Sequence, residues 1–436
     1  MLTEREAQEI VEKALAAVKA DAARVNVWHG RSATTRFANN AITQNVDTQD
    51  QGISVEVSFG PKSGSASGNA FDAGSIASVV RRAEENARVA PPDPEYLPPL
   101  PKVAFPPYDP WNEATAALSA EDRARKVVQV VERARKATLS AAGIVENGSS
   151  ASAVGNSAGL FAFQRGTSYA FSTTMTASDS SGWVSRAGRD IADADIDALA
   201  ARAVERARAA GSPKDWPAGK YPTILEPACL SSIVGLLGWG ISQREIDAGR
   251  SFLSGKRDAK LFDEKIVLRS DPFHARMDGS RWFGEGFPQK PIVWVEDGKF
   301  QNVYYDRFTA KKHSVDPTPW ASNLLLEIKG SGADTVDKMI ASIERGILVT
   351  HFWYIRAVDP MKPLFTGMTR DGLLAIENGK VAGGLKSFRW NENPIDVLNA
   401  IEMSSAPEPA NDVEAETAMV PAVKVKEFNF TSGTLF

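Results

Sequence analysis

In the first 210 residues, the hydrophobic positions of four segments follow the period of an α-helix. These segments lie near residues 3–18, 73–90, 119–140 and 193–210. Between the first and second segments, and again between the third and fourth, apolar and polar residues alternate as they do in half-buried β-strands. Helix, strands and helix thus occur twice in the same order, and we predict a duplicated α/β unit.

Residues 91–110 separate the two copies and are rich in proline. Nine of these twenty residues are proline. Proline has no backbone N–H and a fixed φ angle, so this segment fits neither a helix interior nor a central strand. We predict an extended connector that packs along the protein surface.

Beyond residue 212 the chain changes to short strand-like segments separated by turns, including one Asp-Gly and one Asn-Gly pair that predict hairpins. The apolar run at residues 346–354 is predicted as one strand, and the polar stretch at 405–416 as a loose loop. The predicted fold class is therefore α+β. Residues 1–215 are expected to form the duplicated α/β domain, and residues 216–436 a β-rich, mainly antiparallel domain.

The charge balance and composition exclude several kinds of protein. Lys and Arg total 50 against 54 Asp and Glu, which gives a net charge of −4 and a pI near 5.8. A protein whose main role is to hold nucleic acid usually carries a strong basic excess. The N-terminus has no apolar signal core and no run of about 18 apolar residues occurs, so we expect no membrane span and a cytoplasmic location. The single cysteine, Cys229, rules out an intrachain disulfide framework and fits a reducing compartment.

Several stretches of the chain resemble one known family. They are residues 35–44 (TRFANNAITQ), 283–286 (FGEG), 295–300 (VEDGKF), 344–347 (ERGI), 371–381 (DGLLAIENGKV) and 421–425 (PAVKV). In this order, and over nearly the whole chain, they resemble the TldD/PmbA family, in which PmbA is also called TldE and whose members were once described as modulators of DNA gyrase.

The resemblance implies a peptidase assembly that degrades or trims flexible peptides, including leader segments of modified peptides. In the family, TldD-type subunits hold zinc with a His-Glu-x-x-x-His helix and a late cysteine. TldE-type subunits lack this site and pair with a TldD-type partner.

The positions that would carry this zinc site do not carry its ligands. Matched from the strand at residues 223–225, the two histidine positions fall on Gly235 and Gly240, and the glutamate position falls on Leu236. The late cysteine position falls at 414–418, where there is none. Zinc catalysis needs about three protein ligands and a carboxylate base. The resemblance therefore implies a TldE-like subunit with no zinc of its own and with zinc in its TldD-like partner.

Five residues are candidates for binding a peptide, and none is predicted to be catalytic. His351, Trp353, Tyr354 and Arg356 lie close together in the sequence. The rings and the guanidinium could line a peptide groove or instead fill the core, and His351 could be a packed strand residue. Glu285, in a turn flanked by glycines, could hold a peptide amine or an arginine of the partner, or could cap the turn.

The sequence leaves more than one function open. In the first hypothesis the chain organises substrate for a TldD-like partner, and an unfolded peptide adds to an exposed strand through main-chain hydrogen bonds. In the second it is a homodimeric peptide-binding or regulatory protein with no proteolytic role. A hydrolase that uses Cys229 is disfavoured because a lone buried cysteine usually packs as a small hydrophobe. A metal site made from His274, His313 and His351 is disfavoured because a lone strand histidine such as His351 is more often packed or hydrogen-bonded than a ligand.

Overall fold

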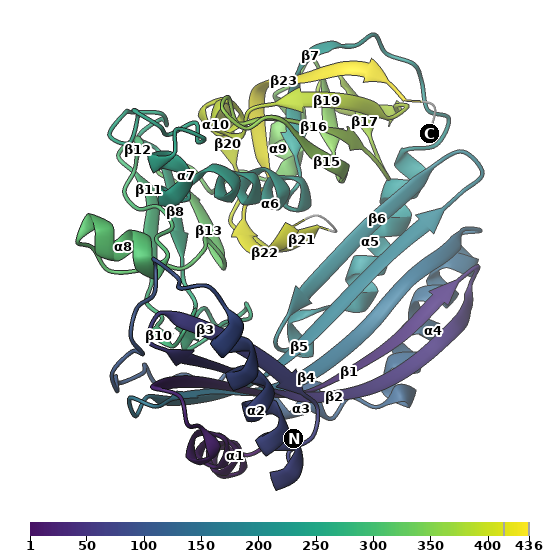
Figure 1. Cartoon of the computed structure of the whole chain (residues 1–436). Helices are drawn as coiled ribbons and strands as arrows, with labels where there is room; N and C mark the ends of the chain where they lie inside the picture. The colour runs from purple at the N-terminus through teal and green to yellow at the C-terminus, as the bar shows by residue number, and fades with distance from the viewer. Residues whose placement is uncertain (413–414, 435–436) are drawn as a thin grey trace.

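The structure is a computed structural model that describes residues 1–412 and 415–434. Its N-terminal half is built on a six-stranded antiparallel sheet with the strand order β3-β2-β1-β4-β5-β6 (Figure 1). The strands are β1 (Ala22–Ala38), β2 (Ala41–Phe59), β3 (Lys62–Gly68), β4 (Ser140–Asn156), β5 (Phe161–Thr176) and β6 (Ser181–Gly188). One end of the sheet packs on α1 (Glu4–Ala17) and α2 (Ala73–Val89), and the other on α4 (Ala120–Lys136) and α5 (Ile196–Ala209).

The two copies of the helix–strands–helix unit match in detail, which confirms the predicted duplication. Both first helices begin with a capping box, formed by Thr3 in α1 and Ser119 in α4. Both last helices approach the third strand of their copy at a glycine. A Cβ added at Gly64 would lie 2.2 Å from the backbone nitrogen of Ala87, and one added at Gly182 would lie 2.3 Å from the carbonyl oxygen of Ala203. These close approaches require glycine at both places.

The proline-rich residues 91–110 form neither helix nor strand. They make hydrogen bonds with both halves of the chain. Asp93 donates its backbone N–H to the carbonyl oxygen of Pro61, and Arg244 of the C-terminal half contacts both carboxylate oxygens of Glu95, at 2.7 and 2.8 Å. A short helix, α3 (Glu113–Ala116), follows.

The C-terminal half contains a nine-stranded sheet and a six-stranded sheet, and most of their strand pairs are antiparallel. The larger sheet has the order β15-β16-β19-β23-β7-β14-β17-β18, with β20 beside β23. Its strands are β7 (Gly219–Leu225), β14 (Arg345–Val349), β15 (Phe352–Asp359), β16 (Leu364–Thr369), β17 (Leu374–Glu377), β18 (Lys380–Gly384), β19 (Phe388–Glu392), β20 (Ile401–Ser404) and β23 (Val423–Gly433).

The smaller sheet has the order β12-β11-β8-β13-β22-β21. Its strands are β8 (Ile266–Ser270), β11 (Ile292–Glu296), β12 (Lys299–Phe300), β13 (Leu324–Ile328), β21 (Glu408–Asp412) and β22 (Ala415–Val420). A separate hairpin is formed by β9 (Trp282–Phe283) and β10 (Phe287–Pro288).

Helix α6 (Pro227–Leu236) shares one hydrophobic core with both of these sheets. Pro227 occupies the first turn, where its missing N–H costs nothing, and eight of the ten residues of the helix are buried. A short 3₁₀ turn, η2 (Leu237–Gly240), continues it. Smaller helices complete this half: α7 (Gln243–Asp247), α8 (Arg307–His313), α9 (Val336–Ala341) and α10 (Pro394–Asn399). Among the described residues, the helices are too short or too polar to span a bilayer.

Two predictions about the C-terminal half are wrong. Residues 346–354 form two strands, β14 and β15, because the chain turns aside at Thr350, whose hydroxyl donates to the carbonyl oxygen of Asp371. Within residues 405–416, β21 and β22 pair where a loose loop was predicted. Their main-chain hydrogen bonds form whatever the polarity of the side chains, so a polar sequence did not prevent pairing. Residues 413–414 lie outside the described part.

The two halves meet where β6 of the first sheet lies beside β21 of the smaller C-terminal sheet. Both are edge strands. Side chains of β6 reach the main chain of β21: Ser185 donates to the carbonyl oxygen of Asn411 at 2.7 Å, and Arg186 donates to that of Pro409. Each edge therefore protects the other from pairing with a further strand.

Candidate functional site

His351 lies in the break between β14 and β15, and only 2% of its surface is exposed. Its Nδ1 is 3.3 Å from Oδ2 of Asp371, and its Nε2 is 3.0 Å from Oδ1 of Asp412. The second contact lacks the alignment of a hydrogen bond and is an ion pair when the ring is protonated. From the N-terminal half, the indole of Trp183 stacks on the imidazole, with ring centroids 4.0 Å apart and planes 9° apart. His351 is thus enclosed by both halves of the chain.

Each of the two carboxylates accepts a hydrogen bond from a serine hydroxyl. Ser181, at the start of β6, donates to Oδ1 of Asp371 at 2.6 Å. Ser232, in α6, donates to Oδ2 of Asp412 at 2.7 Å. A chain of five polar side chains therefore runs from the N-terminal sheet through His351 to helix α6.

This arrangement favours the protonated form of His351. Burial opposes the charge on the ring, but the contacts with Asp371 and Asp412 outweigh it and raise the pKa of His351 above its usual value. Burial also opposes the charge on Asp371, yet the hydrogen bonds from His351 and Ser181 lower the pKa of its carboxyl. The two contacts favour an imidazolium between carboxylates, and among the described residues the ring nitrogens have carboxylate oxygens beside them rather than the hydroxyl of a nucleophile.

A second contact between the halves lies at the start of α6. Arg206 of α5 forms an ion pair with Glu226, the residue that precedes the helix, and both side chains are nearly buried. Cys229 lies in the first turn of α6, with its Sγ 3.5 Å from the carbonyl oxygen of Val349. Burial raises the pKa of the Cys229 thiol well above its usual value, so this cysteine is a buried thiol rather than a reactive thiolate.

Trp353 borders a large cavity between the two halves. The guanidinium of Arg370 lies 4.9 Å from the centre of a Trp353 ring, a cation–π distance. Both residues line a cavity of about 900 Å³, together with Asp371 and with residues 179–181 at the β5–β6 turn. The cavity is thus shared by the candidate residue Trp353 and the His351 cluster.

 A volume of this size is typical of pockets that bind small ligands.

Tyr354 and Arg356 follow on β15, the edge strand of the larger sheet. Tyr354 is 49% exposed and has a left-handed backbone with φ of 56°. The guanidinium of Arg356 lies 4.1 Å from the centre of the Tyr354 ring. These two side chains form an exposed aromatic–cation pair beside a sheet edge, on the same strand as Trp353.

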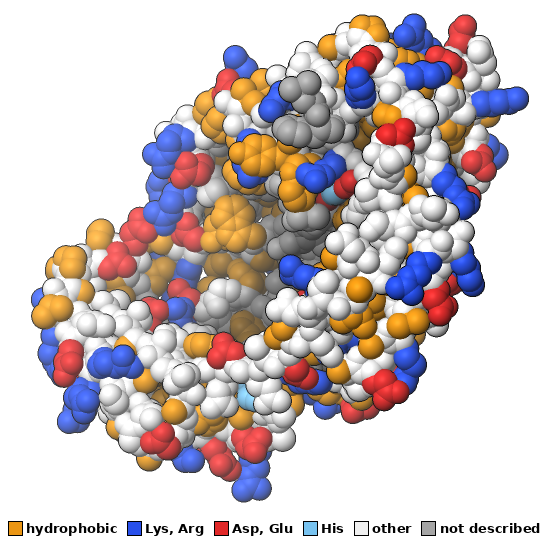
Figure 2. All heavy atoms as spheres, turned by 90° about the vertical axis from the view of Figure 1, so that its right-hand side faces the viewer, with side chains coloured by type: hydrophobic (Ala, Val, Ile, Leu, Met, Phe, Trp, Pro, Cys, Tyr) orange, Lys and Arg blue, Asp and Glu red, His pale blue; other side chains and the backbone are white. Residues whose placement is uncertain are grey.

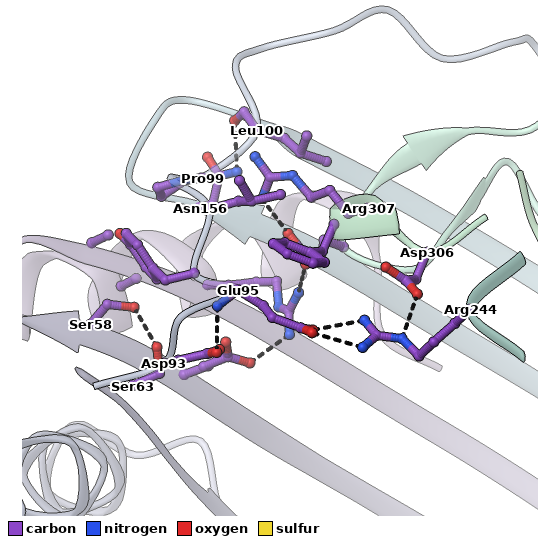
Figure 3. A pocket seen from close by; sticks show the side chains of 18 residues that line it. Ser58, Ser63, Asp93, Glu95, Pro99, Leu100, Asn156, Arg244, Asp306 and Arg307 are labelled. Atoms are coloured by element: carbon purple, nitrogen blue, oxygen red, sulfur yellow. Dashed lines mark hydrogen bonds and ion pairs between the residues drawn. The ribbon is translucent and has the colours of Figure 1, made fainter. Parts of the chain in front are cut away.

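Glu285 is not part of this cluster. It lies in the turn of the β9–β10 hairpin, where it forms ion pairs with Arg307 at 2.7 Å and with Arg24 at 3.7 Å. It lines a separate cavity of about 360 Å³ between the proline-rich connector and both halves. Figure 3 shows this cavity, with Arg244 placed between the carboxylates of Glu95 and Asp306. The structure therefore places His351 near Trp353, pairs Tyr354 with Arg356 on β15, and leaves Glu285 in an ion-pair network elsewhere.

The sequence did not point to Asp371, Asp412, Trp183, Ser181 or Ser232. Asp371 appeared only as the first residue of the stretch 371–381 that carries the family resemblance. Asp412 was hidden in the polar stretch that predicted a loop. Their role depends on long-range packing, since His351 contacts them from 20 and 61 residues away along the chain.

A third, smaller cavity, of about 240 Å³, adjoins α6. Gly235 and Leu236 line it, together with Trp239 of η2, Leu324 of β13 and Ile355 of β15. Gly240 lies outside this lining. A Cβ added at Gly240 would lie 2.2 Å from the ring of Phe252, so the position admits no side chain unless Phe252 moves.

Three domain models of one family match the chain in consecutive order. They are the PmbA/TldA metallopeptidase domain 1 at residues 27–87, the central domain at 94–210 and the C-terminal domain at 218–432. The chain belongs to the PmbA/TldD family.

Solved structures of similar proteins share the fold of this PmbA/TldD chain. TldE from Thermococcus kodakarensis is 18% identical, with a TM-score of 0.84 over 97% of this chain and 99% of that one. A candidate modulator of DNA gyrase from Bacteroides thetaiotaomicron is 20% identical, with a TM-score of 0.84 over the full length of both chains. A similarly described protein from Thermotoga maritima is 18% identical, with a TM-score of 0.83 over 97% of this chain and all of the other. At these identities the similarity shows the fold.

One curated relative also matches. A protein named metalloprotease from Methanothermobacter thermautotrophicus is 24% identical over 226 residues. The match spans 48% of this chain and 48% of that relative, so it covers about half the length of each.

The residues at the positions predicted for the family's metal site do not fit a catalytic zinc ion. Zinc takes nitrogen, sulfur or carboxylate ligands, and Gly235 and Leu236 offer none of these at the cavity wall. Within residues 1–412 and 415–434, no three His, Cys, Asp or Glu side chains are grouped so that they could hold a metal. The late cysteine position at 414–418 falls partly outside the described residues.

Proposed function

We propose that this chain is a non-catalytic, TldE-like subunit of a TldD/TldE-type peptidase in the cytoplasm. It would organise unfolded or leader peptides for a TldD-like partner that holds the zinc. The observation that supports the proposal is the wall of the cavity beside α6, which is lined by Gly235 and Leu236, the residues at two of the positions predicted for the metal site. The proposal also assigns residues 1–215 and 216–436 to separate domains, which is supported by sheets that share no strand across residue 215.

Strand β15 supports a role in binding extended peptides. Among the described residues it ends the order of its sheet, and an extended peptide would add to its outer edge through main-chain hydrogen bonds. Trp353, Tyr354 and Arg356 would then contact the side chains of the peptide. Figure 2 shows that one face of the molecule is hollowed in its centre, with hydrophobic side chains inside the hollow. An unfolded peptide exposes apolar side chains that such a surface would cover.

Reconstitution with a TldD-like subunit tests the proposal. We expect the mixture of the two chains to cleave an unfolded peptide and each chain alone to leave it intact. We also expect the complex to lose all of its zinc when the histidines of the partner are replaced. Y354A/R356A should raise the KM of the complex and leave kcat nearly unchanged. K362A is the matched control, because Lys362 is 78% exposed near the end of the β15–β16 hairpin.

Two results would contradict the proposal. One is peptidase activity or stoichiometric zinc in this chain alone. The other is a stable homodimer that binds peptides and forms no complex with a TldD-like chain, which would favour the alternative of a homodimeric peptide-binding or regulatory protein. Three exposed apolar side chains on the β15–β16 hairpin, Tyr354, Val358 and Met361, are the surface that this alternative would use.

A further inference from the structure

Both ring nitrogens of His351 face carboxylates. Asp371 lies 3.3 Å from Nδ1, and Asp412 lies 3.0 Å from Nε2. Only the imidazolium carries a proton on both nitrogens, whereas a neutral ring leaves one nitrogen without a proton beside a carboxylate. Because His351 is 2% exposed, water does not relieve the repulsion between the two. The cluster is therefore complete only while His351 is protonated.

The side chains whose contacts depend on the charge of His351 come from both halves of the chain. Trp183 of β6 stacks on the imidazole, and Ser181 of β6 holds Asp371. On the other side, Ser232 of α6 holds Asp412. A change in the charge of His351 therefore acts directly on the surface where β6 meets the C-terminal half.

We propose that His351 is a proton-operated latch between the two halves, closed when the ring is protonated and loosened when it is neutral. In the loosened state two carboxylates face one uncharged ring. Strand β6 then loses the stacking contact and the hydrogen bond that it makes with the cluster in the closed state. Asp371 also lines the large cavity beside Trp353, so loosening the latch changes access to that cavity. The inference concerns this chain alone and does not rest on the proposed function.

Four other ionisable groups surround the cluster. Nε of Arg370 lies 3.7 Å from Asp371 and offsets part of its charge. Arg206 of α5 is paired with Glu226 in front of α6, and burial lowers the pKa of Arg206 to about 9. Cys229 of α6 is an uncharged thiol because burial raises its pKa. Of these, Arg206 is the group whose titration must be distinguished from that of His351.

Hydrogen exchange of the full chain between pH 5.5 and 9, corrected for intrinsic exchange rates, measures the latch. The raised pKa of His351 in the closed state means that the closed state binds the proton more tightly. The protection of the backbone amides of β6 against exchange should be constant below about pH 6.5, the ordinary pKa of histidine. Above that it should fall by up to about tenfold per pH unit until His351 is neutral in the closed state, and then level off.

Three variants separate the latch from other causes. H351Q should remove the pH dependence and leave β6 weakly protected throughout. H313Q is the matched control and should behave like the parent, because His313 also contacts a carboxylate, Asp247 at 2.8 Å, but lies within the C-terminal half. If H351Q does not fold, D412N decides the question: removing one carboxylate should shift the fall to lower pH and reduce its total size.

The latch is wrong if protection of β6 in the parent chain does not depend on pH. It is also wrong if the fall persists in H351Q, which would assign it to Arg206, or disappears in H313Q. A D412N profile that matches the parent would overturn it as well.

Discussion

The indole of Trp183 and the imidazole of His351 stack face to face across the junction of the two halves, 4.0 Å apart between ring centroids. The two residues belong to different sheets and lie 168 positions apart along the chain. Their contact joins the edge strand of the N-terminal sheet to the loop that separates β14 from β15. The junction therefore depends on an aromatic contact as well as on the ion pairs around it.

Replacing Trp183 with alanine should lower the free energy of unfolding by about 3 kcal/mol, because a large buried ring is lost and leaves a cavity. Trp183 is only 6% exposed. Urea unfolding monitored by far-UV circular dichroism measures the change. W28A is the control: Trp28 lies in the same sheet but is 38% exposed, and its removal should cost less than half as much. Equal losses in the two variants would show that the junction adds nothing to stability.

Replacing Gly182 with alanine should destabilise the chain by about 2 kcal/mol, because the added methyl group would push β6 away from α5. The atoms in its way are backbone atoms, Ala203 O at 2.3 Å and Ala207 N at 2.5 Å, which cannot rotate aside. G30A is the matched control in the same sheet, since the nearest atom there is 3.9 Å away, and it should change stability by no more than about 0.5 kcal/mol. Thermal unfolding of both variants tests the difference.

The duplicated half of the fold could be predicted because local signals specify it. The capping boxes at Thr3 and Ser119 mark the helix starts, and alternating residues mark the strands. The break at Thr350 and the pairing of β21 with β22 could not be predicted, because hydrogen bonds to distant segments decide both. The same applies to the site: the sequence placed His351 beside Trp353, but packing of β6 and β21 supplies Trp183 and Asp412.

Glu392 should make the stability of the chain depend on pH. Burial raises the pKa of this carboxyl to about 7, although it accepts a hydrogen bond from the backbone of Asn429. The folded state then holds the proton more tightly than the unfolded state, so stability should fall as pH rises from about 4.5 to 7. E392Q should therefore raise the free energy of unfolding by about 1–2 kcal/mol at pH 8 and change it little at pH 4.5.

Urea unfolding of the parent and E392Q at both pH values checks this prediction. E377Q is a suitable control, because Glu377 is an exposed strand residue of the same sheet. A stabilisation that is the same at pH 4.5 and pH 8 would mean that E392Q acts through packing and not through its charge.

Arg244 should hold the proline-rich connector against the C-terminal half. It contacts Glu95 of the connector through two nitrogens, at 2.7 and 2.8 Å, and Asp306 at 3.1 Å (Figure 3). In R244A, limited proteolysis within residues 91–110 should be several-fold faster, because the connector loses this anchor. R250A is the control, since Arg250 pairs only locally with Glu245. An unchanged cleavage rate in R244A would show that the other connector contacts are sufficient.

Metal removal should not affect the isolated chain. Gly235 and Leu236, which line the cavity beside α6 and stand at two of the predicted metal-site positions, offer no ligand, so we expect a chelator to extract no structural ion there. We expect EDTA to change the melting temperature by less than about 1 °C, and elemental analysis to find less than about 0.1 zinc per chain, whereas a zinc-bound domain would lose stability on chelation. A TldD-like chain treated in the same way is the positive control. A drop in melting temperature that added zinc reverses would place an ion on this chain and contradict the assignment of zinc to the partner.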